Sequence, residues 1–302
     1  MMRVPLKNIL SVDIKRNQSH EELRRYIQAK QEAAQIRQLD CSIYVCEEQF
    51  GIQHPLYSFI QSMPTLEHVK FSGFDDENVS IDALLDAISQ NHSIYTVDLY
   101  KIDCSTYAIL QLMEQKMKWK VWFCCFIGHP PTLNKFTSYI EELFVQTNDL
   151  SVMDFMAKIP SWPFLRQLSI GVPLKLEFVQ YLEHIIPAAP ILQELTLRNI
   201  HFDDPDLLQS FSTLVFNAPS PDLKWHLNDC RFYPNTIAVL EEIVKSEKAE
   251  SMRIKLTLQK FSNGTGNYQV LLRTIMSESS RVGNLDIIDE DGDAMLDILP
   301  LL

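Results

Sequence analysis

The stretch of this sequence that most resembles a chemical site is LDIIDEDGDAMLD, residues 285–297, which carries six acidic side chains around one glycine. A calcium-binding EF-hand loop needs oxygen ligands at positions 1, 3, 5 and 12 and a glycine at position 6. With Gly292 at position 6, Asp289 and Asp291 fill positions 3 and 5, but isoleucines fall at positions 1 and 12. The first ligand and the bidentate acid are therefore missing, and the stretch fails as a calcium loop.

Adjacent cysteines Cys124 and Cys125, with His129 close behind, offer a second kind of chemistry, a thiol nucleophile with a histidine base. No carboxylate follows to orient the base, and the hydrophobic spacing places Cys125 at a core position. The cysteines show no CxxC spacing and the histidines no HxxxH spacing, so no zinc site is predicted. The sequence also contains no P-loop lysine after a glycine-rich turn. We therefore expect no enzyme, no cofactor and no metal.

Four segments share one hydrophobic spacing, with apolar residues at positions 1, 4 and 6 and, in three of them, at position 9. They are LEHVKFSGF from Leu66, IYTVDLYKI from Ile94, FLRQLSIGV around Leu165 and LQELTLRNI from Leu192. Weaker copies place further position-4 residues at 43, 125, 225, 256 and 285. Seven of the eight steps between successive position-4 residues lie near 28 residues, and the step from Cys125 to Leu168 is 43. Helical stripes such as SIDALLDAISQN lie between these segments, which predicts alternating strands and helices.

This pattern resembles the leucine-rich repeat family, LxxLxLxx(N/C)xL in units of about 20–29 residues. The long units are most similar to the ribonuclease-inhibitor-like subclass, and the resemblance covers roughly residues 40–302. The sequence departs from the pattern at position 9, where Phe74, Ile102 and Ile200 replace the usual asparagine and only Cys230 fits. The resemblance implies an α/β fold, a right-handed solenoid or horseshoe with parallel strands on the concave face and helices on the convex face. An ordinary α/β domain is the alternative.

The ends of the repeat and its one long step suggest the domain organisation. Residues 1–39 are interpreted as an N-terminal segment and a capping helix, because Ser19 and Glu22 form an S-x-x-E capping box. Residues 40–302 form a solenoid of about nine units, and the long step predicts an insertion near 129–160 with two consecutive helices.

Acidic residues precede several of the predicted helices, at positions 75–76, 203–204 and 289–291. There a carboxylate can cap free backbone amides and meet the positive end of the helix dipole. Pro205 suits a first helical position. The acidic stretch that resembled a calcium site is therefore interpreted as another helix start.

Charge and hydropathy exclude several classes of partner. The net charge is −12, from 27 basic and 39 acidic residues, which argues against binding nucleic acid or an anionic membrane surface. The longest apolar run, KWKVWFCCFIG, is far shorter than the roughly 20 residues that span a bilayer. No secretory signal is recognised, and dispersed cysteines are typical of reduced thiols. We expect a cytoplasmic or nuclear protein without membrane insertion.

Because strand side chains alternate, positions 5 and 7 of each unit are expected to point out from the concave face. Aromatic and charged residues at these positions are typical of binding hot spots. The candidate binding residues are Tyr44, Lys70, Tyr100, Phe126, Arg198 and His226. We expect a non-catalytic protein–protein interaction scaffold that binds another protein on this face. The alternatives are a substrate-recognition subunit of a ubiquitin ligase, since residues 4–14 are weakly similar to the start of an F-box, a structural subunit of a large assembly, or a secreted host-targeting effector.

Overall fold

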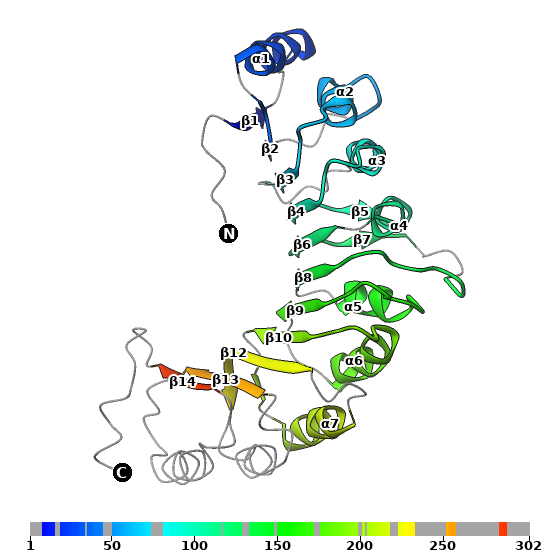
Figure 1. The fold of residues 1–302 in the computed structure, drawn as a ribbon, viewed down its shortest axis with the longest axis vertical. Coiled ribbons are helices and arrows are strands. Elements are labelled where there is room, and N and C mark those ends of the chain that lie inside the picture. The colour runs from blue at the N-terminus through cyan, green and yellow to red at the C-terminus, as the bar shows by residue number, and fades with distance from the viewer. Residues whose placement is uncertain are drawn as a thin grey trace. The chain divides into compact units, whose positions relative to one another are not determined.

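The chain divides into two compact units, Met1–Phe164 and Leu165–Leu302, and each combines parallel strands with helices in an α/β arrangement (Figure 1). The two units are described separately below. The structure is a computed structural model that describes residues 8–15, 19–33, 35–44, 50–73, 81–115, 117–128, 133–147, 150–171, 176–198, 201–202, 204–217, 223–232, 252–257 and 284–288.

In the first unit the main strands lie side by side in the order of the sequence, and each neighbouring pair is parallel. They are β1 (Ile9–Ile14), β2 (Gln38–Ile43), β3 (His68–Gly73), β4 (Thr96–Tyr100), β6 (Lys118–Trp122) and β8 (Glu142–Gln146). Two short strands, β5 (Cys104–Ser105) and β7 (Phe126–Ile127), form a separate parallel pair. A doubly wound sheet reverses its strand order at a switch point, whereas here each strand adds to the same edge of the sheet.

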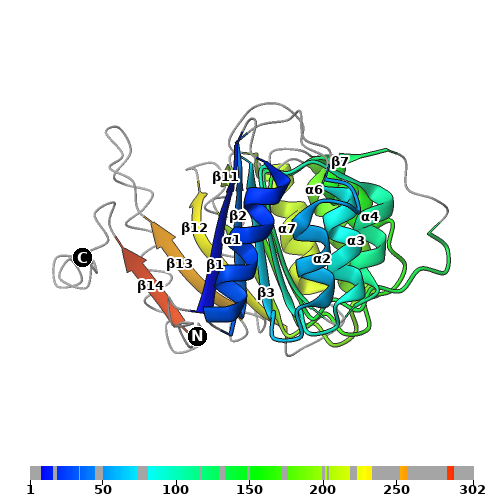
Figure 2. The same cartoon turned by 90° about the horizontal axis from the view of Figure 1, so that it is seen from above.

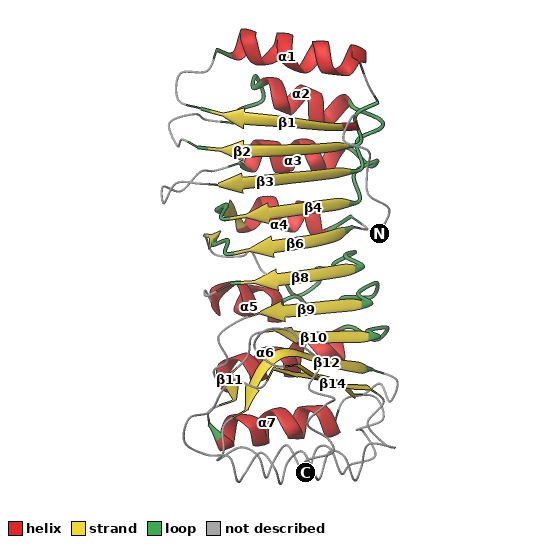
Figure 3. Cartoon of the chain, turned by 90° about the vertical axis from the view of Figure 1, so that its left-hand side faces the viewer, coloured by secondary structure: helices red, strands yellow, loops and turns green. Residues whose placement is uncertain are grey.

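The described helices of the first unit all lie on one side of its strands (Figures 1 and 2). They are α1 (His20–Ala33), α2 (Pro55–Ser62), α3 (Asp82–Gln90), α4 (Thr106–Met113) and α5 (Leu150–Ala157). Figure 3 views the strands from the other side, which we call the open face. Its residues are Ile9, Ser11, Asp13, Gln38, Asp40, Ser42, His68, Lys70, Ser72, Thr96, Asp98, Tyr100, Lys118, Lys120, Trp122, Glu142, Phe144 and Gln146.

The core of the first unit follows from strict alternation along the strands, with one face buried against the helices. One row of register partners runs through all six main strands, and none of its side chains is more than 2% exposed: Leu10, Leu39, Val69, Val97, Trp119 and Leu143. The stripe predicted on α3 is confirmed, because Leu84, Leu85 and Ile88 are fully buried. Each such side chain contributes about 1.5–3 kcal/mol relative to an exposed one.

The middle of the first unit differs from the sequence prediction. The insertion with two helices near residues 129–160 is absent from the described part, because Glu142–Gln146 forms strand β8 and only Leu150–Ala157 is helical. The row of register partners passes from Val97 to Trp119 and Leu143, in steps of 22 and 24 residues. Strand β8 therefore divides the step that was predicted to be long. The unit before it, from Val97 to Trp119, is short because helix α4 has only eight residues.

The N-terminal boundary also differs, because the sheet begins before residue 40. Residues Ile9–Ile14 form β1, which pairs in parallel with β2. The helix predicted for residues 19–39 spans His20–Ala33, and Tyr26 on it donates a hydrogen bond from its hydroxyl to the Ser11 carbonyl of β1, at 3.0 Å. The capping helix thus follows a strand that belongs to the sheet.

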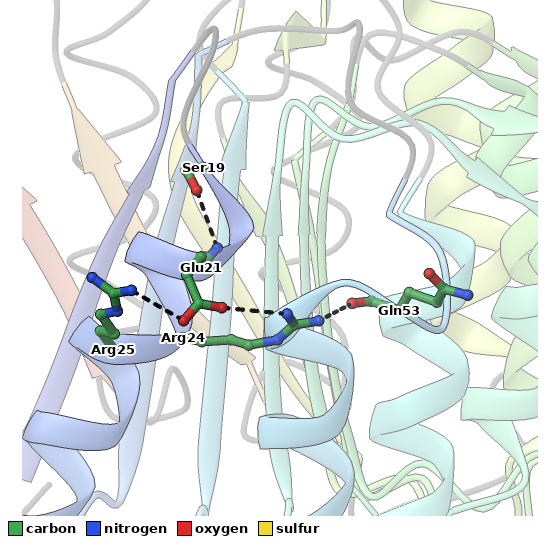
Figure 4. Close-up of polar contacts among 5 residues, drawn as sticks. All are labelled: Ser19, Glu21, Arg24, Arg25 and Gln53. Carbon is green, nitrogen blue, oxygen red and sulfur yellow. Dashed lines mark hydrogen bonds and ion pairs between the residues drawn. The ribbon is translucent and has the colours of Figure 1, made fainter.

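Polar contacts at the start of α1 link it to the chain ahead of α2 (Figure 4). The Ser19 hydroxyl oxygen accepts a hydrogen bond from the Glu21 backbone amide at 3.3 Å, as expected of the first residue of the capping box. The Glu21 carboxylate pairs with Arg25 at 3.3 Å and with Arg24 at 3.9 Å, and Arg24 donates to the Gln53 carbonyl. These exposed pairs contribute little each, about 0–1 kcal/mol.

The start of α2 is capped by a buried histidine. The Nδ1 atom of His54 accepts a hydrogen bond from the Leu56 backbone amide at 3.3 Å, and the side chain is 1% exposed. Its ring meets those of Phe50 and His20 edge-on, with centroids 4.9 and 5.0 Å apart. Burial, together with smaller contributions from the neighbouring His20 and Arg24, lowers the pKa of His54 from 6.5 to about 4. The helix start is therefore capped by a neutral imidazole.

This cap predicts a loss of stability in acid. Because the pKa of His54 is 6.5 when unfolded and about 4 when folded, the unfolded chain binds the proton first as the pH falls between these values. We expect His54 to contribute on the order of 2–3 kcal/mol above pH 6.5, a contribution that disappears toward pH 4. Denaturant unfolding at about pH 7 and about pH 5 checks this against His54→Asn, which keeps a capping oxygen but does not titrate. Parallel pH profiles for the two proteins would contradict it.

The second unit repeats the arrangement of strands. Its strands follow each other in parallel and in sequence order, and the short strand β11 (His201–Phe202) pairs with the end of β12. The others are β9 (Gln167–Gly171), β10 (Glu194–Arg198), β12 (Lys224–Phe232), β13 (Met252–Thr257) and β14 (Asn284–Ile288). Leu168, Leu195 and Trp225 are register partners and at most 1% exposed, so they form the same kind of core row.

Two helices are described in the second unit, α6 (Leu176–Ala188) and α7 (Pro205–Phe216). The helix start predicted at Asp204 is confirmed: its Oδ1 accepts a hydrogen bond from the Asp206 backbone amide at 2.9 Å, and Pro205 is the first helical residue. The other predicted acidic helix starts, at residues 75–76, 203 and 289–291, lie outside the described residues.

Candidate functional site

The structure places the six predicted binding residues in both units, four in the first and two in the second. Lys70 is exposed in β3 and Tyr100 is half-buried at the end of β4, both on the open face. Tyr44 lies beyond the end of β2, where its backbone amide donates to the Ile14 carbonyl at 3.0 Å. The register partner of Lys70 on β2 is Asp40, so the position predicted for Tyr44 was wrong by four residues.

Phe126, predicted to point outward, is buried in β7 and does not belong to the open face. Its ring stacks parallel to that of Trp119, with centroids 6.1 Å apart, and meets Phe155 edge-on at 5.4 Å. The register partner of Asp98 on the open face is Lys120. The prediction for Phe126 is therefore wrong, because the strand was placed at residues 122–127 instead of Lys118–Trp122.

The same shift reverses the expected roles of the adjacent cysteines. Cys124 is buried and Cys125 exposed, whereas the sequence placed Cys125 in the core. Burial raises the pKa of the Cys124 thiol to about 12, and burial also raises that of Cys104 well above its usual value. Neither buried thiol is poised as a thiolate nucleophile at neutral pH. His129, the proposed base, lies outside the described residues.

The open face carries an aromatic patch that the sequence analysis largely missed: Tyr100, Trp122, Phe123 and Phe144. Tyr100 and Trp122 are register partners on β4 and β6, and Phe144 lies on β8. The Trp122 and Phe144 rings contact each other with centroids 4.3 Å apart, and Tyr100 meets Phe123 edge-on at 6.3 Å. Phe123 is 38% exposed. The alternation in KWKVW places Trp122 on the open face only when the strand is known to start at Lys118.

The backbone at the rim of the patch adopts a conformation that is unusual for side-chain-bearing residues. Lys101 and Phe123, which follow β4 and β6, both have φ of 51°. Their backbone amides donate to the carbonyls of Trp122 and Gln146 on the next strand. At the preceding strand, a Cβ on Gly73 would lie 2.3 Å from the Lys101 carbonyl oxygen, so this position requires glycine. Such strained residues cluster at functional sites.

Charged residues on the open face are mostly paired across strands. The Asp98 carboxylate lies 3.3 Å from His68 Nε2 and 3.8 Å from Lys120 Nζ, and Lys118 pairs with Glu142. The exposed Lys70 lies between its register partners Asp40 on β2 and Asp98 on β4. Lys101, also exposed, follows Tyr100 at the end of β4. The Nζ of Lys101 lies 5.8 Å from the centre of the Tyr100 ring. Beside the patch, the register row Asp40, Lys70, Asp98 and Lys120 therefore alternates negative and positive charge across β2, β3, β4 and β6.

In the second unit, the predicted residues Arg198 and His226 lie on strands β10 and β12. Arg198 donates from Nε to the Ser169 hydroxyl oxygen of β9 at 3.1 Å. His226 is the register partner of Thr196 and is half-buried. Both residues alternate with the buried residues of their strands, so they lie on the outward face of their own unit, as predicted. Their role in binding stays a prediction.

Within the described residues, no three histidine, cysteine, aspartate or glutamate side chains are gathered in a way that could hold a metal ion. Residues 289–297 of the acidic stretch and the glycine-containing turn at 261–268 lie outside that part of the chain. Among the helices described, none has the length and apolar character needed to cross a membrane.

Comparison with known proteins does not assign this chain to a family. No family profile matches the sequence, and no curated protein matches it either. The class that the structure defines is an α/β protein of parallel, repeat-like units. Its best-defined surface feature is the aromatic patch on the open face of the first unit.

Proposed function

We propose that this chain is a right-handed leucine-rich-repeat solenoid of the ribonuclease-inhibitor-like subclass, a horseshoe that acts as a non-catalytic scaffold for binding another protein. Three observations support the fold. Strands add in sequence order, successive core residues from Leu10 to Leu143 are 22 to 30 residues apart, and the helices of the first unit share one side. Stacked units of this kind present an extended strand face that is suited to partners.

The observation that carries the function is the aromatic patch on the open face. Aromatic side chains bury large areas on binding and dominate interface energetics. On the strands of this unit the remaining open-face positions are polar or charged except Ile9 on the distant β1, so the patch has the apolar centre and polar rim of a protein interface. The buried thiols with raised pKa values, Cys104 and Cys124, support a binding role over a catalytic one.

The test is a double substitution, Tyr100→Ala with Trp122→Ala, in the full chain. We expect affinity for any protein held by this face to fall at least tenfold, because truncating a hot-spot aromatic costs about 2 kcal/mol or more. Quantitative affinity purification with the wild type and the variant measures it, and the thermal unfolding midpoint checks folding. Tyr107→Ala on α4, 66% exposed, is the matched control and is expected to retain the same proteins. An unchanged set of bound proteins in the double variant would refute the proposal.

Two further features bear on the alternatives. Leu10, Val12 and Ile14, three of the apolar residues of the F-box-like stretch, are at most 3% exposed in β1, so an adaptor could reach these three only by opening the unit. This argues against the ubiquitin-ligase alternative. Cys104 and Cys124 carry buried, free thiols, which supports the cytoplasm or nucleus as the compartment.

A further inference from the structure

We propose that the N-terminal end of the first unit binds an extended peptide segment of a partner protein, which adds as a strand to the free edge of β1. The free edge consists of the backbone N–H and C=O groups of Ile9, Ser11 and Asp13. This site is separate from the aromatic patch, because β1 is the first strand of the sheet and the patch begins at β4. The inference therefore does not depend on the function proposed for the open face.

The hydrogen bonds of β1 show which of its backbone groups lack a neighbouring strand. Among the described residues, β1 is flanked by a strand on one side only, β2. Ile14 faces β2, because its carbonyl oxygen accepts a hydrogen bond from the Tyr44 amide at 3.0 Å. Successive residues of a strand bond alternately to the two sides of the sheet, so Leu10 and Val12 face β2 as well. The three residues of the free edge point to the other side.

The position of Tyr26 agrees with this direction and defines the back of the site. Its hydroxyl donates to the Ser11 carbonyl oxygen at 3.0 Å, so that carbonyl points toward α1 and away from β2. The Tyr26 side chain is 41% exposed, and Ala29, on the same side of α1, is exposed as well. A strand beside β1 would lie against this apolar surface. The Ser11 carbonyl has two lone pairs and can accept a second hydrogen bond from it.

Strand β1 lacks most of the devices by which edge strands avoid pairing. Unpaired edges are typically very short, bulged or interrupted by proline. β1 has six residues, contains no proline and keeps a continuous register with β2 from Ile9 to Ile14. Its one charged residue, Asp13, lies on the open face. The free edge therefore keeps the regular spacing of donors and acceptors that an extended backbone matches.

The position of α1 selects an isolated extended segment over the edge of a second copy. Helix α1 lies beyond β1 at the N-terminal end of the unit, on the helix side of the sheet (Figures 1 and 3). Two copies joined through antiparallel β1 strands would be related by a two-fold axis perpendicular to the sheet, which keeps both α1 helices on the same side. The two helices would meet before the strands could pair. An extended segment carries no such helix and would continue the sheet in front of α1.

The alternation of side chains along a strand predicts the chemistry of the partner segment. Pairing from Ile9 to Asp13 involves about five partner residues. Those that face the helix side would contact Tyr26 and Ala29, which favours aliphatic side chains. Those that face the open side would lie beside Ser11 and Asp13, which favours polar side chains. The predicted partner is therefore an extended segment with aliphatic residues at every second position, held mainly by backbone hydrogen bonds.

The experiment is a selection of random dodecapeptides displayed on phage against the full-length chain, with the affinities of enriched synthetic peptides measured by fluorescence anisotropy. Ser11→Pro removes the N–H in the middle of the free edge but none that is bonded to β2, and proline is tolerated on edge strands in this orientation. We expect it to weaken peptide binding at least tenfold. Ser11→Ala, which keeps the N–H, is the matched control and is expected to bind within twofold of the wild type. The thermal unfolding midpoint checks the folding of both variants.

Amide hydrogen exchange gives a second readout, residue by residue. In the chain alone, the Ser11 and Asp13 amides are expected to exchange faster than those of Leu10 and Val12, because only the latter two are bonded to β2. A saturating selected peptide should slow the exchange of Ser11 and Asp13 at least tenfold. If Ser11→Pro unfolds the chain, peptides N-methylated at alternate positions replace it. Methylation of one alternate set should then abolish binding, and methylation of the other set should not.

Each other result overturns the proposal in a distinguishable way. Peptides that bind Ser11→Pro as well as the wild type, or a selection without enrichment, would refute the free edge as a binding site. Loss of the same peptides in Trp122→Ala would assign their binding to the open face. Slow exchange of Ser11 and Asp13 in the chain alone would show that the edge is already covered. Protection that appears with rising protein concentration, without peptide, would assign the edge to a second copy.

Discussion

Phe126→Ala is expected to lower the free energy of unfolding of the first unit by about 3–5 kcal/mol. Its ring fills the space between Trp119, fully buried in the core row, and Phe155 on α5. Truncation leaves a cavity between two large aromatic side chains, and neither can collapse into it without leaving its own packing. Denaturant unfolding followed by far-ultraviolet circular dichroism measures the loss.

Phe123→Ala is the matched control for this prediction. It removes the same side chain three residues earlier, but Phe123 is 38% exposed at the rim of the aromatic patch. We expect a change in unfolding free energy of under about 1 kcal/mol, since little area is lost from the core. Equal losses for the two variants would contradict the placement of strand β6 at Lys118–Trp122 and restore the outward position predicted for Phe126.

The fold was predictable where a long apolar strand pattern and a helical stripe agreed. The segments around Val69, Val97, Leu168 and Leu195 were correctly aligned, and the register pairs Val69 with Val97 and Leu168 with Leu195. In these units, period-2 and 3.6-residue patterns alternate at a nearly constant spacing, so each supports the other. The α/β class and the parallel strands followed from that agreement.

The middle of the first unit could not be placed from sequence because two registers fit the same letters. In KWKVWFCCFI, both Trp119 with Val121 and Cys125 with Ile127 offer apolar residues at alternate positions. The expected spacing of about 28 residues favoured the later register, whereas the short helix α4 brings the next strand earlier. Strand β8 was not predicted for a similar reason, because the apolar residues of IEELFVQ also fit the spacing of an amphipathic helix.

The candidate site depended on this register. Lys70 and Tyr100 were placed on the outward face because β3 and β4 were aligned correctly, and Phe126 failed because β6 was not. Contacts across strands, such as that between Trp122 and Phe144, join residues that are 22 positions apart. No local sequence pattern indicates that two such distant residues are in contact. The aromatic patch could therefore be identified only from the structure.

A buried amide between helices α2 and α3 shows how the units are joined on the helix side. Asn91 follows α3 and is 6% exposed. Its Nδ2 donates to the carbonyls of Ile60 and Met63 at the end of α2, at 2.6 and 2.9 Å, and its Oδ1 accepts from the Ser93 backbone amide at 3.0 Å. One side chain therefore satisfies two of the carbonyl groups that the end of a helix leaves without a backbone partner.

Asn91→Asp is expected to lower the free energy of unfolding by about 3–5 kcal/mol near neutral pH. The substitution keeps the shape but replaces two N–H donors with a carboxylate oxygen, which faces the Ile60 and Met63 carbonyls as a buried, unpaired charge. The deficit should shrink as the pH falls, because a protonated carboxyl can donate one hydrogen bond again. Denaturant unfolding at several pH values measures both effects. Asn217→Asp, at the exposed end of α7, is the control and should change stability by under about 1 kcal/mol. A similar small change in Asn91→Asp would show that this amide does not hold the two helix ends together.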